Sequence, residues 1–153
     1  MTPAAADQIV VRDAQARDAW AVARLVSSIG YPTNESDMAA RLAAIGQEPN
    51  RRTLVAEIEG AVAGVAGVAL SRQYERGGIY GRLALLAVSE DKRHRGVGRA
   101  LVTEAEAWAA AEGAGLMIVS SGHHRHDAHR FYERAGYEST GLRFMKRIGA
   151  VRT

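Results

Sequence analysis

Apolar side chains recur along this chain with two different periods, and each period indicates the element that the stretch forms. Between Ala16 and Ile29 they recur every three or four residues, which is the spacing of one helix face. Gly30-Tyr31-Pro32 ends this helix, because proline cannot continue a helix and restricts the residue before it. Similar spacing predicts three more helices, which cover about Glu35 to Ile45, Gly96 to Glu112 and Asp127 to Arg134.

Shorter apolar runs, some with alternating polarity, predict strands. The alternation is clearest after Thr53, where Leu54 and Ile58 fall on one face of the strand and Glu57 on the other. The predicted strands are Ile9 to Val11, Thr53 to Glu59, Ala61 to Ser71, Ile79 to Val88, Leu116 to Ser120, Tyr137 to Ser139 and Leu142 to Ile148.

The order of these elements predicts the fold class. The helix between the strands Ile79 to Val88 and Leu116 to Ser120 makes those strands parallel neighbours in one sheet. We therefore expect an α/β (α+β) fold, with a mixed central sheet flanked by helices on both faces. The chain has 153 residues and 47% hydrophobic content, which suits a single domain over residues 1–153.

Composition restricts the chemistry and the location that we expect. The chain has no cysteine, so it forms no disulfide and carries neither a thiol nucleophile nor a thiolate metal site. Its first residues lack a basic segment followed by an apolar core, and no apolar run approaches the length of a membrane span. We expect a soluble, cytoplasmic protein without a membrane partner.

The positive charge does not point to nucleic acid. The formal net charge is +3, and Lys92 and Lys146 are the only lysines among 20 basic residues. Arginines are scattered along the chain except around residues 93–99 and 125–134, whereas a duplex would need a longer basic stripe. We expect no nucleic-acid partner.

The stretch from Leu83 to Leu101 predicts an anion site. An apolar strand meets a short basic turn, and Gly96-Val97-Gly98 then begins a helix. The first N–H groups of a helix have no partner within it and carry partial positive charge, and glycines let a phosphate approach them closely. The alternative is an ordinary tight turn with solvated arginines. The pattern is neither a Walker motif nor a dinucleotide-binding G-x-G-x-x-G motif.

Two motifs here resemble those of the GNAT family of N-acetyltransferases. Arg93-His94-Arg95-Gly96-Val97-Gly98 matches the family's R/Q-x-x-G-x-G/A signature directly after the expected strand. Ala128-His129-Arg130-Phe131-Tyr132-Glu133-Arg134-Ala135-Gly136-Tyr137 matches its A-x-x-F/L-Y-x-x-x-G-F/Y segment. The resemblance is clear from about Ile79 onward and implies that acetyl-CoA is the co-substrate.

The resemblance also implies which residues bind acetyl-CoA. The pyrophosphate would lie on the basic turn, and the pantetheine arm would bond the backbone at the end of the preceding strand, where the family's two central strands splay apart. The implied residues are Leu86, Ala87, Val88, Arg93, His94, Arg95, Gly96, Val97, Gly98 and Arg99.

Tyr132 is the catalytic residue that the resemblance implies. A phenol, with a pKa of about 10, can hydrogen-bond the leaving thiolate and give up its proton as negative charge builds on sulfur. The alternative is a half-buried aromatic that only packs a short helix. No carboxylate lies on the strand from Leu83 to Val88, and the residues that could relay the amine's proton through water are Glu35, Glu75, His123 and His124.

The acceptor site is expected in two loops, residues 30–36 and 72–78. The implied acceptor-binding residues are Tyr31, Glu35, Tyr74 and Glu75. For Tyr31, ordinary packing at a turn is the alternative interpretation. Arg125 stands where relatives often have asparagine, and it could instead reach a phosphate of CoA or a carboxylate of the substrate.

The run from His123 to His129 allows a metal interpretation, because His126 and His129 would share one helix face. Two adjacent arginines oppose binding of a cation, and Asp127 is the only acidic ligand nearby. We therefore expect a titratable surface turn and predict no metal.

The sequence thus favours an enzyme that transfers an acetyl group from acetyl-CoA directly to the primary amine of a small molecule. The alternatives are acetylation of a protein N-terminus or lysine, and a non-catalytic module that senses acyl-CoA. The resemblance also suggests a homodimer, because terminal strands of this kind often pair between subunits in the family.

Overall fold

The computed structural model describes residues 8–120, 126–141 and 143–149. The chain forms two compact units, Met1–Ile118 and Val119–Thr153. The elements of the first unit are β1 (Ile9–Asp13), a 3-10 turn η1 (Ala16–Asp18), α1 (Ala19–Ser28), α2 (Glu35–Gly46), β2 (Arg51–Ile58), β3 (Ala61–Arg72), β4 (Ile79–Val88), a 3-10 turn η2 (Glu90–Lys92), α3 (Val97–Ala111) and β5 (Ala114–Val119), whose last residue begins the second unit. The second unit contains α4 (His126–Arg134).

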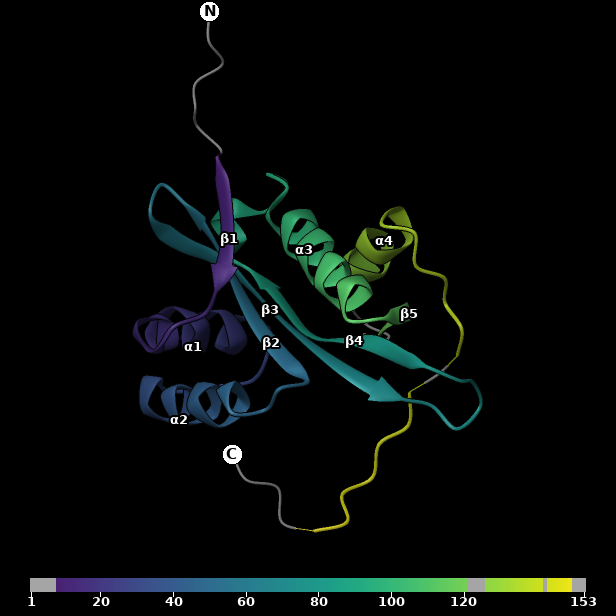
Figure 1. The fold of residues 1–153 in the computed structure, drawn as a ribbon. Coiled ribbons are helices and arrows are strands. Elements are labelled where there is room, and N and C mark those ends of the chain that lie inside the picture. Colours follow the sequence, from purple (N-terminus) through teal and green to yellow (C-terminus); the bar gives the residue numbers. More distant parts are fainter. Residues whose placement is uncertain (1–7, 121–125, 142, 150–153) are drawn as a thin grey trace, which may run out of the picture. The chain divides into compact units, whose positions relative to one another are not determined.

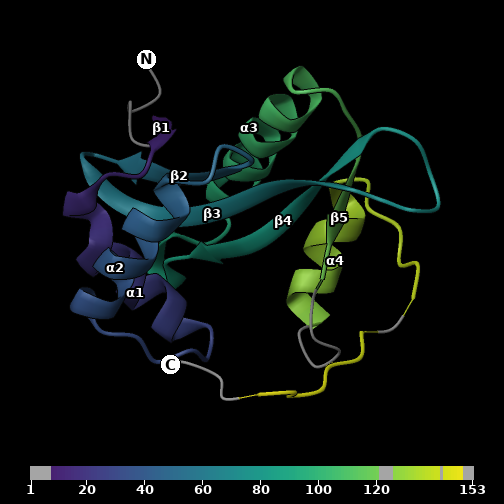
Figure 2. The ribbon, with the colours of Figure 1, turned by 60° about the horizontal axis from the view of Figure 1, so that its bottom comes forward.

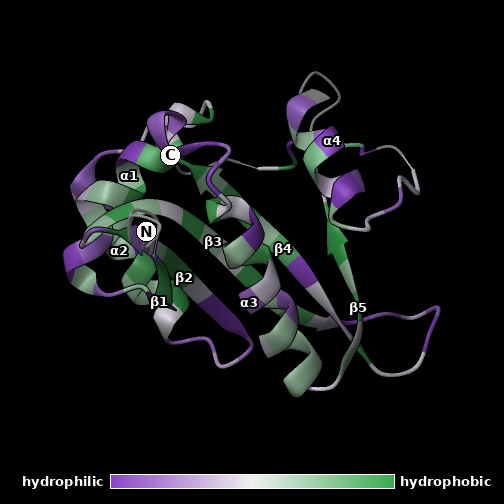
Figure 3. Cartoon of the chain, turned by 90° about the horizontal axis from the view of Figure 1, so that it is seen from above, coloured by the Kyte–Doolittle hydropathy of each residue, from purple (hydrophilic) through white to green (hydrophobic). Residues whose placement is uncertain are grey.

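The strands form one mixed five-stranded sheet in the order β1-β2-β3-β4-β5 (Figure 1). The first four strands pair antiparallel, and α3 joins β4 to its neighbour β5, as the sequence predicts. The hairpin turn between β2 and β3 holds Glu59 and Gly60 at positive φ angles of 52° and 79°. Figure 2 shows the long β3–β4 hairpin, whose hydrophilic loop also stands out in Figure 3.

Helices of the first unit cover both faces of the sheet, which confirms the predicted architecture. On one face, Val55, Val65 and Ala87 of the strands form a core with α1 and α2, which lie side by side in Figure 1. On the other face, Gly64 lies against the first turns of α3. Because successive residues of a strand point to opposite faces, the contacts of Gly64 and Val65 place α3 across the sheet from α1.

The first predicted helix is divided in the structure. The apolar period starts at Ala16, but residues 16–18 form the 3-10 turn η1 and the α-helix begins at Ala19. The cause is the carboxylate of Asp18, which accepts a hydrogen bond from the Gln15 N–H at 2.7 Å and so tightens the first turn.

The two predicted C-terminal strands are absent from the described residues. Residues 137–141 and 143–148 have no strand assignment, although their alternation predicts one, and Phe144 and Ile148 are 87% and 94% exposed. A strand needs a ladder partner as well as alternating polarity, and this segment pairs with no other strand within the described ranges. The local sequence pattern alone was therefore insufficient to predict a strand in this segment.

Gly64 allows α3 to approach the sheet, and its replacement provides a stability test. A Cβ at this position would lie 2.8 Å from Val97 Cγ1 and 2.9 Å from Leu101 Cδ1. Gly64→Ala should therefore lower the free energy of unfolding by about 1–3 kcal/mol, as overpacking of a core usually does. Urea unfolding measures this change.

Gly67 provides the matched control, because it lies on the same strand and a Cβ there would meet Leu85 Cβ at an ordinary 3.4 Å. Gly67→Ala should change stability by less than about 1 kcal/mol. If Gly64→Ala unfolded at the same urea concentration as Gly67→Ala, the tight contact between β3 and α3 would be contradicted.

Candidate functional site

The turn between β4 and α3 presents the open N-terminus of a 15-residue helix. Gly96 is the residue before this helix and has a φ of 86°, a left-handed conformation that glycine adopts without steric cost. His94 also has a positive φ, 65°, which is uncommon for a residue with a side chain. Gly96 has no side chain with which to cap the helix, so the first N–H groups of α3 point into the turn, where an anion would accept their hydrogen bonds.

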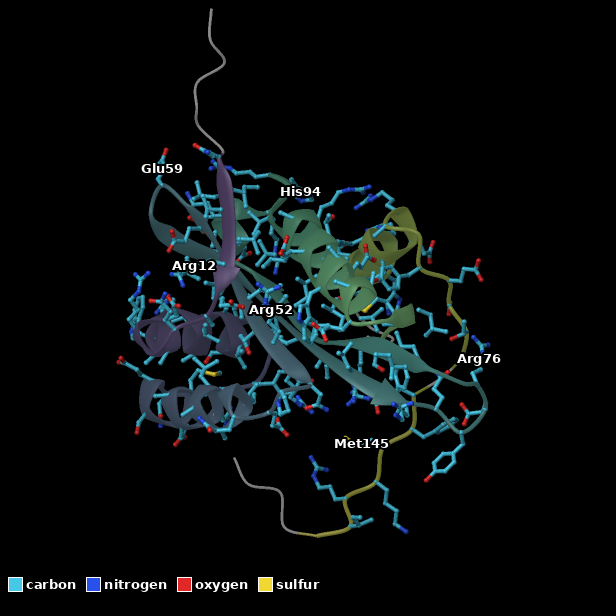
Figure 4. The ribbon with its side chains drawn as sticks, in the orientation of Figure 1. Arg12, Arg52, Glu59, Arg76, His94 and Met145 are labelled. Atoms are coloured by element: carbon cyan, nitrogen blue, oxygen red, sulfur yellow. The ribbon has the colours of Figure 1, made fainter. Side chains whose placement is uncertain are left out.

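Exposed basic side chains surround this turn. Arg93, His94, Arg95 and Arg99 are all exposed, and Figure 4 shows where His94 lies. They add full positive charges to the partial charge of the helix N-terminus. The space beside Gly96 suits a phosphate, because among the described residues other than its chain neighbours the nearest atom to a Cβ there would be Ile9 Cδ1, at 3.8 Å.

Asp91, at the start of the turn, is held by its neighbours. The Ser89 hydroxyl donates a hydrogen bond of 2.5 Å to Asp91 Oδ1, and this bond is the main reason that the pKa of Asp91 lies below its usual value. Lys92 Nζ lies 3.9 Å from the same carboxylate and lowers its pKa further. The negative charge of Asp91 is therefore already balanced by its own neighbours, although it lies just before the basic turn.

Successive residues of β4 direct their backbone hydrogen-bonding groups to opposite sides of the strand. The Ser89 N–H donates to Ala63 O at 2.8 Å, so Ser89 faces β3. By the same alternation the backbone groups of Ala87 are directed to β3, and those of Leu86 and Val88 are directed away from it. The three positions remain predictions for binding pantetheine.

An open pocket of about 470 Å³ begins where β4 ends. Its lining combines charged and hydroxyl side chains with one buried apolar residue. The lining residues are Arg24, Leu25, Ser28, Ser89, Glu90 and Asp91. Sequence reasoning missed Arg24 and Glu90. The available signals were an arginine four residues after Trp20 on the polar face of a helix, and a glutamate immediately after the central strand.

The four predicted acceptor residues are not brought together. Tyr74 and Glu75 lie in the loop before β4, whose position in Figure 4 is marked by the neighbouring Arg76, and the basic turn follows the opposite end of that strand. A strand of ten residues spans roughly 30 Å. Tyr31, 59% exposed, and Glu35, in the first turn of α2, belong instead to the segment that joins α1 to α2.

The loop that carries Tyr31 is held by hydrogen bonds of its own. The Ser27 hydroxyl accepts from the Thr33 N–H at 3.0 Å, and Arg41 Nη1 donates to Thr33 Oγ1 at 3.2 Å. The Thr33 hydroxyl in turn donates to Tyr31 O at 2.8 Å. An ordered loop thus presents an exposed aromatic ring at Tyr31, whose role in acceptor binding stays a prediction.

Tyr132 lies in the second unit, half-buried on α4. Its ring stacks on Phe131 with centroids 5.3 Å apart and meets Tyr137 edge to face at 5.8 Å. The Tyr137 N–H donates to Tyr132 O at 2.9 Å across the left-handed Gly136, which ends the helix. Three aromatic rings and this helix end therefore fix the orientation of Tyr132 within its unit.

The remaining sequence candidates lie mostly outside the described residues. His123, His124 and Arg125 fall there, and the side chain of His126 is also not described. In the part of the chain that the structure does describe, no three His, Cys, Asp or Glu side chains are grouped to hold a metal ion. Nor does any described helix have the length and hydropathy needed to cross a membrane.

Comparison with known proteins agrees with this fold and turn. The acetyltransferase (GNAT) family model matches residues 19–137. The aminoalkylphosphonate N-acetyltransferase of Salmonella typhimurium is 30% identical over 124 residues, which cover 81% of this chain and 78% of that protein.

Solved structures of similar fold cover nearly the whole chain. A GNAT family acetyltransferase from Staphylococcus aureus superposes with a TM-score of 0.77 and 24% identity, over 92% of this chain and 98% of that one. An aminoglycoside N-acetyltransferase in complex with CoA superposes with a TM-score of 0.81 and 16% identity, over 92% and 94% of the two chains.

The fold and the basic turn define an acetyltransferase of the mixed α/β type, and the chain belongs to the GNAT family of N-acetyltransferases. The predicted family and fold class are thereby confirmed. The family uses acetyl-CoA, and a CoA complex is among the solved structures of similar fold.

Proposed function

We propose that this protein transfers the acetyl group of acetyl-CoA directly to the primary amine of a small molecule. The observation that carries the proposal is the uncapped N-terminus of α3 behind the left-handed Gly96, ringed by exposed arginines. The similarity to an aminoalkylphosphonate N-acetyltransferase supports a small acceptor. The pocket of about 470 Å³ at the end of β4 has the size of a small-molecule site.

The reaction makes three demands on the chain. The amine nitrogen bonds to the acetyl carbon as the carbon–sulfur bond breaks, the amine gives up a proton, and the thiolate of CoA gains one. When bound, acetyl-CoA supplies an activated acyl group, so the protein needs only to orient the reactants and to move protons. The N–H of Val88, which faces away from β3, is the donor that we assign to the oxyanion.

Tyr132 is the group that we assign to protonate the departing thiolate, acting as a general acid. Its ring is held by Phe131 and Tyr137, so its hydroxyl has a fixed direction within the second unit. For the amine proton we propose relay through water to a carboxylate or a histidine. Glu35 and Glu75, named from the sequence, remain predictions for this role, as do Tyr31 and Tyr74 for acceptor binding.

The first test is thermal stabilisation of the purified protein by acetyl-CoA, CoA, NAD and ATP. We expect saturable stabilisation by acetyl-CoA and CoA only, because ligands that bind the folded state raise its stability by mass action. Gly98→Glu should abolish the shift, since it places bulk and negative charge in the second position of α3. The absence of a shift with either form of CoA would overturn the proposed co-substrate.

Gly46→Glu is the matched control for this experiment. Gly46 is also a helical glycine of the first unit, at the end of α2, and no described residue beyond its own helix backbone and chain neighbours comes within 4 Å of where its Cβ would be. The same side chain added there should leave the CoA-dependent shift intact. A loss of the shift in both variants would indicate a general effect of the added glutamate instead of a specific one at the turn.

Turnover distinguishes the proposed enzyme from the alternative, a non-catalytic module that senses acyl-CoA. A protein that bound acetyl-CoA but released no CoA with any amine would be a binding module. Acetylation of protein N-termini or lysines is distinguished by comparing peptides with small amines in the same assay.

A single domain over residues 1–153, a cytoplasmic location and a homodimer remain predictions from the sequence and the family resemblance.

A further inference from the structure

The pocket at the end of β4 is lined by charges of both signs, and two of the charged residues, Arg24 and Glu90, have no ion-pair partner among the described residues. We propose that this pocket holds the acceptor, and that Arg24 selects amines that also carry an anionic group, such as a carboxylate, phosphate or phosphonate. The inference rests on the proposed acetyl transfer and specifies its substrate class.

Arg24 is a cation available to a ligand. Its guanidinium carbon lies 5.1 Å from the centroid of the Trp20 ring, one helical turn earlier on α1, and it makes no ion pair with any described residue. Trp20 is itself 57% exposed, so this contact is a platform on the helix surface and does not bury the charge. A guanidinium that contacts an aromatic ring through its face can still use its N–H edge for bidentate contact with a carboxylate or phosphate.

Glu90 is the complementary anion. The neighbouring Asp91 already accepts a hydrogen bond from the Ser89 hydroxyl and lies near Lys92. The Glu90 side chain, in contrast, has no partner among the described residues. An unpaired carboxylate on the wall of a small pocket attracts an ammonium group. One free cation and one free carboxylate in the same pocket match a substrate with opposite charges at its two ends.

The position of the pocket suits an acceptor. Ser89 lines it and directly follows Val88, whose backbone we expect to bond pantetheine. The buried Leu25 provides an apolar surface at the helix side, and the Ser28 hydroxyl, which donates to Leu25 O at 2.6 Å, can accept a further hydrogen bond. A short aminoalkyl chain with an ammonium group at one end and an anionic group at the other matches this lining. A polycation matches it less well, because it would place a second positive charge beside Arg24.

The test compares four amines of similar length in a CoA-release assay: 2-aminoethylphosphonate, β-alanine, ethanolamine and propylamine. The wild type should acetylate the two anionic amines with a kcat/KM about tenfold or more above that of the neutral pair. Arg24→Gln should raise KM for the anionic amines by about tenfold or more, the usual effect of losing a charged hydrogen bond. KM for ethanolamine and for acetyl-CoA should change by less than about threefold.

Three further variants sharpen the comparison. Compared with Arg24→Gln, Arg24→Lys should recover part of the preference for anionic amines, since lysine restores the positive charge without the two-pronged guanidinium. Glu90→Gln should raise KM for all four amines alike. Arg17→Gln, which alters an exposed arginine of η1 outside the pocket, should leave every constant unchanged. Thermal unfolding of each variant confirms that it is folded.

The outcomes separate the inference from the proposed function. Turnover without a preference for anionic amines, or a loss in Arg24→Gln that is equal for ethanolamine, would overturn the inference and leave the acetyltransferase intact. A rise confined to the KM for acetyl-CoA would assign Arg24 to the co-substrate and would also overturn it. A wild type that binds acetyl-CoA but acetylates no amine would overturn the proposed function, and the inference with it.

Discussion

Tyr132→Phe is expected to lower kcat for acetyl transfer by about 10²-fold or more, the usual loss when a general acid is removed. The effect should fall on kcat, with KM for acetyl-CoA nearly unchanged, because the hydroxyl acts only as the thiolate leaves. Phenylalanine preserves the stacking on Phe131 and the edge-to-face contact with Tyr137, so the helix should remain folded. Steady-state kinetics at saturating amine measures the change.

Tyr137→Phe is the matched control for this result. Tyr137 lies in the same aromatic group and loses the same hydroxyl, but it carries no assigned role in the reaction. Its kcat should stay within about threefold of the wild type. If Tyr132→Phe also stayed within that range, the general acid would have to be another group or water.

Asp18→Asn is expected to lower the free energy of unfolding at pH 7 by about 3 kcal/mol, the lower end of the range for breaking a buried ion pair. Asp18 is 3% exposed, and its carboxylate accepts two hydrogen bonds from Arg12, at 2.8 and 2.9 Å. Arg12 also donates to Glu57 Oε1 at 2.6 Å, so the substitution does not leave the guanidinium without an anion. This remaining pair explains why we expect the lower end of the range.

The effect should depend on pH with a definite sign. The hydrogen bonds from Arg12 are the main reason that the pKa of Asp18 lies below its usual value, and they outweigh the opposing effect of burial. A carboxyl group whose pKa is lowered by folding contributes stability above its unfolded pKa of about 3.9, and loses it as the pH falls through the folded value. The stability difference between wild type and Asp18→Asn should therefore narrow progressively below pH 4.

Asp13→Asn serves as the comparison, because Asp13 accepts from Arg52 Nε at 2.6 Å but its side chain is 66% exposed. Exposed pairs of this kind contribute little, so this variant should lose no more than about 1 kcal/mol. Urea unfolding at pH 7 and pH 3 measures both variants. A gap for Asp18→Asn that stayed constant across this range would show that its pKa is not lowered by folding.

Local pattern was sufficient for most of the fold. Helical and alternating periods place α1, α2, α3 and α4 and the five strands within a few residues of their observed bounds, because each period reflects one buried face. The local pattern gave a wrong prediction where the structure of a segment depends on a contact with another residue or strand. Residues 137–148 alternate like a strand but have no ladder partner among the described residues, and Ala16 to Asp18 form a 3-10 turn because of a side-chain bond.

The sequence by itself determined the family and the position of the basic turn, because both depend on contiguous motifs. The catalytic role of Tyr132, which the second motif implies, stays a prediction. Only the tertiary structure decided which distant residues meet. It joined Arg24 of α1 to Glu90 in one pocket and paired Asp18 with Arg12. Such meetings depend on how helices pack on a sheet, and no local period along a single chain contains that information.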